Sequence, residues 1–243
     1  MLVFGIEIPI EISVSALVGA ATGAVWLGCT LFARSVLMRT VGSADTGGFP
    51  RWRATIGYVT QALVLPSVFM VALRLGGSSD HSLGLMAAWS AAELNGLRHA
   101  ATHAFAWIFG GLMLFDLALL QFEPMILAHH ILCLGGLLCA SVCAPSMYPY
   151  FIAGVMILEL GSGACNFYWC DRSQPLRSYL YGWVMSLSNL GALCCSARWS
   201  FSAAVDGPAA WLGVLSFSLI AGLAYMRQKE AMKYVLFSHP KGA

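Results

Sequence analysis

The chain has 243 residues, of which 59% are hydrophobic and only 10% are charged, and its formal net charge is +2. A soluble domain typically carries about 25% charged residues, so this composition is too apolar to cover a water-exposed surface. It excludes an ordinary soluble enzyme and a disordered chain, and the small net charge argues against a nucleic-acid partner. The composition therefore predicts a protein that crosses a membrane several times.

The apolar stretches predict the helices in chain order. Glu7 and Glu11 stand where a signal peptide would carry basic residues, so we expect the first apolar stretch to be a spanning helix. A spanning helix needs about 20 mostly apolar residues. Stretches of this length occur at 13–33, 55–75, 101–121, 125–144, 149–170, 178–197 and 209–227. They predict an all-α polytopic membrane bundle of about seven transmembrane helices, forming a single domain over residues 1–243.

One further segment, 82–94, is too short and too polar at its ends to span, which indicates an interfacial or re-entrant helix. The basic residues give the orientation. With the N-terminus outside the cytoplasm, ten of the 13 Lys and Arg residues fall on the cytoplasmic side, and three lie opposite. Because cytoplasmic segments carry an excess of Lys and Arg, this predicts an external N-terminus and a cytoplasmic C-terminus.

Four ionisable residues lie inside predicted spans, where such residues are costly and usually functional. Asp116 lies near the end of one span, His129 and His130 begin the next, and Glu159 lies within the third. Short connections make these helices antiparallel neighbours, so we expect the Asp116 carboxylate and an imidazole to meet. A histidine oriented by a carboxylate is suited to general acid–base catalysis. The alternative is a hydrogen-bond network that only holds the helices together.

Other polar and small residues have less specific interpretations. Asn166 can hydrogen-bond a lipid head group or a neighbouring helix backbone. His99 and His103 have the i, i+4 spacing of a metal pair but lack further ligands, which favours interfacial histidines and no metal site. The eight cysteines fall mostly in apolar runs, where they act as packing residues. The paired glycines at 110–111 and 135–136, with those at 161 and 163, indicate close helix packing.

Three motifs follow one another in a fixed order. GGLMLFD ends at Asp116, PMILAHH ends with His129 and His130, and ILELGSGACNFYW contains Glu159. In this order and spacing they resemble the TLC domain shared by TRAM, the Lag1-type ceramide synthases and the CLN8-like proteins. The similarity covers about residues 50–230. Ceramide synthases carry a run of aspartates after the His-His pair, which this chain lacks, so it is more similar to the CLN8-like and small TLC-domain members.

The resemblance implies a protein of the endoplasmic reticulum or another endomembrane, with helices around a cavity that accepts membrane lipids. The His-His pair and the intramembrane carboxylates Asp116 and Glu159 would line this cavity. The resemblance also implies a protein that binds or modifies a lipid. The ceramide synthases suggest acyl transfer as the modification, with acyl-CoA as co-substrate and no bound cofactor. His129 and His130 would then be the acid–base pair, with Asp116 as their partner. Glu159 and Asn166 would bind the lipid.

Two other functions are compatible with the sequence. The first is a non-catalytic TLC-fold subunit of a larger membrane complex, in an organellar inner membrane or as a homo-oligomer. The eight Trp, 13 Phe and 11 Met residues offer apolar surface for such protein partners. The second is a haem or metal redox protein that uses the histidines, which visible absorbance would reveal.

Overall fold

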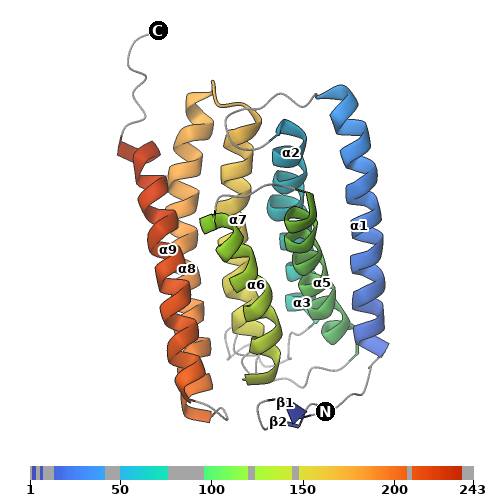
Figure 1. Ribbon diagram of the computed structural model, residues 1–243, viewed down its shortest axis with the longest axis vertical. Coiled ribbons are helices and arrows are strands. Elements are labelled where there is room, and N and C mark those ends of the chain that lie inside the picture. Colours follow the sequence, from blue (N-terminus) through green and yellow to red (C-terminus); the bar gives the residue numbers. More distant parts are fainter. Residues whose placement is uncertain are drawn as a thin grey trace.

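The computed structural model describes residues 2–3, 6–7, 14–41, 50–75, 96–119, 124–143, 148–206 and 210–236. Within them the chain is helical apart from one short antiparallel pairing, and the helices stand side by side in an upright bundle (Figure 1). The strands are β1 (Leu2–Val3) and β2 (Ile6–Glu7). The helices are α1 (Val14–Thr40), α2 (Arg51–Val59), the π-helical η1 (Thr60–Val64), α3 (Leu65–Leu75), α5 (Gly96–Leu119), α6 (Pro124–Cys143), α7 (Tyr148–Cys170), α8 (Pro175–Asp206) and α9 (Ala210–Leu236). The all-α prediction is confirmed for this part of the chain.

Three helical segments in the described residues are long and apolar enough to cross a membrane. They are Ala20–Thr40, Arg51–Val71 and Tyr150–Cys170. Thr102–Ala118 and Leu127–Leu137 are shorter apolar helices. These lengths indicate a membrane protein, whereas seven spans stay a prediction. The predicted interfacial segment 82–94 lies outside the described residues.

Some pairs of helices pack against each other much more extensively than others. The most extensive packing joins α7 to α8, α8 to α9, and α1 to α5. The main apolar core lies between α3, α5, α7 and α8, around buried side chains that include Phe105, Phe109, Ile152 and Trp199. Helix α6 makes much sparser contacts, with α5, α7 and α9. Residues of α6 also line a cavity, which is described below.

A π turn shapes the helical segment that runs through α2, η1 and α3. Pro66 has no backbone N–H, and its ring clashes with the carbonyl of the residue four positions earlier in a regular α-helix. The chain widens to η1 directly before it, where the Leu65 N–H donates to the Thr60 carbonyl. This turn places Gln61 in the interior, where only 4% of the residue is exposed. A π turn within an α-helix is often found at a functional site.

The turn between α7 and α8 is closed by a short polar motif. The Ser173 hydroxyl and backbone N–H donate to Asp171 Oδ1 over 2.6 and 3.1 Å. These bonds hold the pKa of Asp171 below its usual value. Pro175 then begins α8, a position where its missing N–H costs no helical bond.

Candidate functional site

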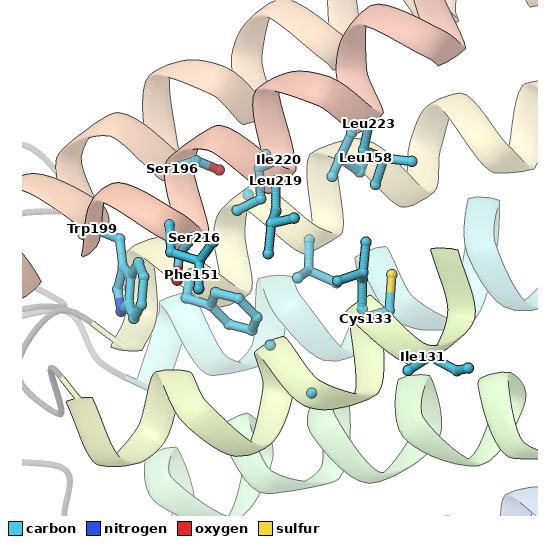
Figure 2. Close-up of a pocket in the computed structure, with 16 residues that line it drawn as sticks. Ile131, Cys133, Phe151, Leu158, Ser196, Trp199, Ser216, Leu219, Ile220 and Leu223 are labelled. Atoms are coloured by element: carbon cyan, nitrogen blue, oxygen red, sulfur yellow. The ribbon is translucent and has the colours of Figure 1, made fainter. Parts of the chain in front are cut away.

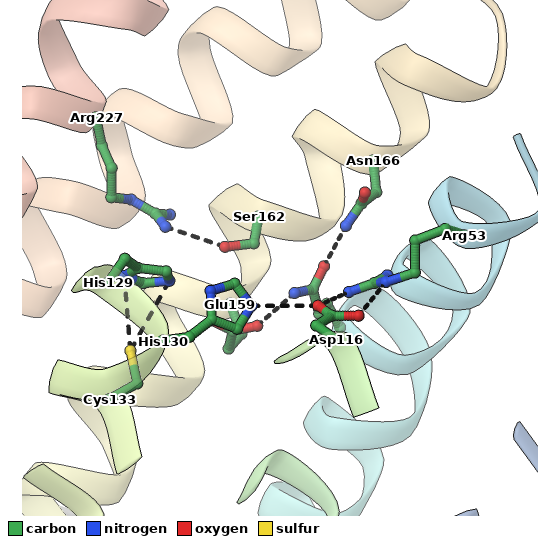
Figure 3. Close-up of polar contacts among 10 residues, drawn as sticks. Arg53, Asp116, His129, His130, Cys133, Glu159, Ser162, Asn166 and Arg227 are labelled. Carbon is green, nitrogen blue, oxygen red and sulfur yellow. Dashed lines mark hydrogen bonds and ion pairs between the residues drawn. The ribbon is translucent and has the colours of Figure 1, made fainter. Parts of the chain in front are cut away.

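A chain of three side chains joins α2, α5 and α6 inside the bundle. Arg53 donates from Nε to Oδ1 and from Nη2 to Oδ2 of Asp116, so the pair is bidentate. His130 Nε2 lies 3.2 Å from Asp116 Oδ2. All three side chains are almost fully buried, at 3–6% exposure. Figure 3 follows the interaction from Arg53 through Asp116 to His130.

The two histidines take different partners, as expected for adjacent positions on a helix. Their rings lie 5.3 Å apart between centroids and are nearly perpendicular, at 85°. His130 meets Asp116, which confirms the expected contact between carboxylate and imidazole. His129 lies against Cys133 one turn later, with its Nδ1 3.6 Å from the sulfur. The Asp116 contact can orient only the His130 ring, which makes His130 the better candidate for acid–base catalysis.

A second polar chain joins η1 to α7. Gln61 Nε2 donates to Glu159 Oε2 over 2.6 Å, and Asn166 Nδ2 donates to Gln61 Oε1 over 2.6 Å. Gly57 allows this approach, because a Cβ there would overlap both Arg53 and Asn166. The Asn166 amide therefore bonds a side chain of a neighbouring helix. Its predicted role in lipid binding stays a prediction.

A third cluster joins α7, α8 and α9 around Arg227. Its Nε donates to Asn189 Oδ1 over 3.1 Å, its Nη1 to Ser162 Oγ over 3.0 Å, and its Nη2 to the Leu158 carbonyl over 2.7 Å. The Asn189 amide in turn donates to Gln228 Oε1 over 3.1 Å. Together the three clusters, called the polar network below, join residues of α2, η1 and α5 to α9.

An apolar cavity of about 350 Å³ lies between α6, α7, α8 and α9 (Figure 2). Its volume falls in the range of small-molecule sites, roughly 300–1,000 Å³. Trp199 and Phe151 lie at one end, and Cys133, Leu158 and Leu223 gather at the other. The second end adjoins the polar network, because Cys133 contacts His129 and the Leu158 carbonyl accepts a bond from Arg227.

The lining of this cavity does not include the predicted site residues. Asp116, His129, His130 and Glu159 were expected to line a lipid-accepting cavity, and the residues that line this one are their apolar neighbours. The reason is that three of the four side chains bond one another or Gln61, away from the apolar space. Gly135 was expected to pack closely, yet a Cβ there would meet nothing within 4 Å, and this glycine forms part of the cavity wall.

Close packing holds at two other glycines. A Cβ at Gly161 would overlap Ser188 and come within 2.9 Å of Arg227 Nη2. A Cβ at Gly163 would lie 3.3 Å from the Ala62 side chain and backbone. Here the absence of a side chain is what lets α7 approach α8 and η1.

Three residues of the network were not among the predicted site residues. Arg53 and Arg227 contributed to the predicted orientation and had no predicted role in the site, whereas both are bonded within the bundle, and Gln61 had no assigned role. The sequence contains a signal for Arg53 and Gln61. Arg53, Gly57 and Gln61 are spaced i, i+4, i+8, which places them on one helix face. No such spacing in the sequence predicts that Arg227 contacts α7.

The remaining histidines and the cysteines were also considered as ligands in the sequence. Among the described residues no group of three His, Cys, Asp or Glu side chains could hold a metal ion. His103 is partly buried in α5, and the side chain of His99 lies outside those described. Six cysteines in the described part of the chain are free thiols, including adjacent Cys194 and Cys195.

The comparisons with known proteins give no family for this chain. No protein-family model, no curated protein and no solved structure matches it. The resemblance to the TLC domain therefore stays a prediction, and the geometry of the site is what indicates a function.

Proposed function

We propose that this chain is a multipass membrane protein that binds a single-chain lipid in the cavity between α6, α7, α8 and α9. The observation that supports it is an apolar cavity whose one end adjoins a buried polar network. Along α9 the lining extends from Leu215 to Leu223, roughly 12 Å at ~1.5 Å per residue. A hydrocarbon chain fits such a space lengthwise, with its polar head at the network.

The network also supplies groups for acyl transfer to that lipid. In this reaction a hydroxyl or amine of the lipid attacks the carbonyl carbon of an acyl-CoA thioester. A C–O or C–N bond forms and the C–S bond breaks. His130, oriented by Asp116, takes the proton from the nucleophile and returns it to the leaving thiolate. Arg53 holds the Asp116 carboxylate in place.

The wider setting follows the resemblance to the TLC domain. Seven spans, an external N-terminus and a cytoplasmic C-terminus place the polar network toward the cytoplasmic side, where acyl-CoA is available. An endoplasmic-reticulum or other endomembrane location agrees with such a reaction. Epitopes inserted at either end test the orientation, since a cytoplasmic N-terminus would contradict it.

Filling the cavity should abolish lipid binding while leaving the fold intact. Gly135→Phe places a large side chain on the cavity wall at a position where nothing lies within 4 Å. We expect the amount of radiolabelled 1-oleoyl lysophosphatidate bound by purified protein to fall at least tenfold, or about 1.4 kcal/mol of binding free energy. Gly28→Phe is the matched control, because Gly28 on α1 also has open space and lies outside this cavity. Equal binding by Gly135→Phe and wild type would contradict the proposal.

A second candidate is the non-catalytic subunit of a larger membrane complex. The observation in its favour is that Arg53, Asp116, His130, Gln61 and Glu159 form bonds mainly with one another, as expected of a network that holds helices together. Native mass measurement after mild detergent extraction distinguishes the two. A stable complex with other subunits favours this candidate, whereas a lipid-bound monomer or dimer favours the first.

A further inference from the structure

Arg227 carries a positive charge inside the bundle that no described carboxylate pairs with directly. Its three hydrogen-bond partners are an amide oxygen, a hydroxyl and a backbone carbonyl, all neutral. The ion pairs among the described residues are Arg53–Asp116, His130–Asp116 and Lys233–Glu230. Glu159 is near enough to interact with Arg227 electrostatically, but it accepts its hydrogen bond from Gln61.

Arg227 is partly buried, and its hydrogen-bond partners leave its charge free to bind an anion. Ionisable residues within a membrane bundle are costly and usually pair with an opposite charge or a ligand. A guanidinium has five N–H donors, and three of those of Arg227 are used by Asn189, Ser162 and Leu158. Within the described residues, two N–H groups remain for an acceptor. Carboxylate and phosphate oxygens are the acceptors that arginine binds best.

The position of Arg227 relates this charge to the cavity. Leu223, which lines the cavity, precedes Arg227 by one helical turn and shares its face of α9. Leu158 lines the cavity with its side chain and accepts the Arg227 bond with its carbonyl. Arg227 therefore lies within one helical turn of the end of the cavity that Leu158 and Leu223 form, whereas the lining residues Ser196 and Ser216 lie at the other end, near Trp199.

We propose that Arg227 binds the oxyanion head group, carboxylate or phosphate, of a single-chain lipid whose hydrocarbon chain occupies the cavity. This inference rests on the proposed lipid-binding function and adds the chemical class of the ligand. The cavity selects a single apolar chain, and Arg227 selects against neutral heads. The neutral partners of Arg227 hold the guanidinium in position without cancelling its charge.

Matched lipid pairs test the head group separately from the chain. Binding of radiolabelled palmitate and methyl palmitate, and of 1-oleoyl lysophosphatidate and monoolein, is measured on full-length protein in nanodiscs. At least one anionic lipid should bind about tenfold to hundredfold more tightly than its neutral partner. Arg227→Gln should abolish that preference, and Arg227→Lys should keep part of it. Arg198→Gln, which removes an exposed arginine of α8, should leave the preference unchanged.

The outcomes separate the two proposals. Equal affinity for anionic and neutral lipids in the wild-type protein would overturn the head-group inference and leave lipid binding standing. Absence of binding by all four lipids would overturn the proposed function and the inference with it. If Arg227→Gln does not fold, the wild-type comparison alone decides. A preference for palmitate assigns a carboxylate head, and a preference for lysophosphatidate assigns a phosphate.

Discussion

Replacing Asp116 by alanine is expected to lower the free energy of unfolding by about 3–5 kcal/mol. The carboxylate accepts two bonds from Arg53 and contacts His130, and all three side chains are buried. Its removal leaves the Arg53 charge in an apolar interior without a partner. Denaturant unfolding in mixed micelles measures the effect.

Two control variants distinguish the cost of leaving the Arg53 charge without a partner from the cost of removing the whole Arg53–Asp116 pair. In the double variant Arg53→Met, Asp116→Leu no charge is left unpaired, so its stability should lie close to that of the wild type. Glu230→Ala breaks the exposed Glu230–Lys233 pair and should cost less than about 1 kcal/mol, because water already solvates both groups. A double variant as unstable as Asp116→Ala would show that the pair itself, and not the orphaned charge, matters for stability.

Replacing His130 by asparagine should lower acyl transfer by about 10²–10⁴-fold, the usual contribution of a general acid or base. Lipid binding should be unchanged, since His130 does not line the cavity. His129→Asn should have a smaller effect, because His129 contacts Cys133 and the described contacts of Asp116 run to His130. Initial rates of acyl transfer from palmitoyl-CoA to the hydroxyl of 1-oleoyl lysophosphatidate in proteoliposomes give the comparison.

In cells, His129→Ala and His130→Ala together should abolish lipid turnover by a protein that still folds. A normal lipid profile with both alanines would exclude the catalytic role and favour the subunit of a complex. Unchanged transfer by His130→Asn, with intact lipid binding, would instead limit the protein to carrying lipid.

The sequence was informative where neighbouring helices are joined by short connections. The contact between Asp116 and His130 follows from one connection, because it fixes both the antiparallel direction and the relative depth of α5 and α6. The bonds Arg53–Asp116 and Gln61–Glu159 join positions 63 and 98 residues apart. They depend on which helices become neighbours in the bundle, and hydrophobic composition does not determine that order.

The residues that line the cavity could not be predicted from the sequence. A lipid-accepting space was expected near the histidines, but its walls come from the sparse packing of α6 and from side chains of α9, such as Leu219 and Leu223. Gly135 illustrates the difficulty. In sequence it looks the same as Gly161, yet one borders open space and the other lies against Ser188 and Arg227.

The sparse packing of α6 links the chemistry of the site to the docking of a whole helix. Helix α6 has sparser contacts than the other helices, so the His130–Asp116 contact adds to the packing of Leu134 and Leu137 in holding it in place. A ligand or substitution that breaks the His130–Asp116 contact should therefore also loosen the attachment of α6. Backbone amides of α6 should therefore exchange with deuterium faster than those of α7 and α8, and binding of lipid should slow them first.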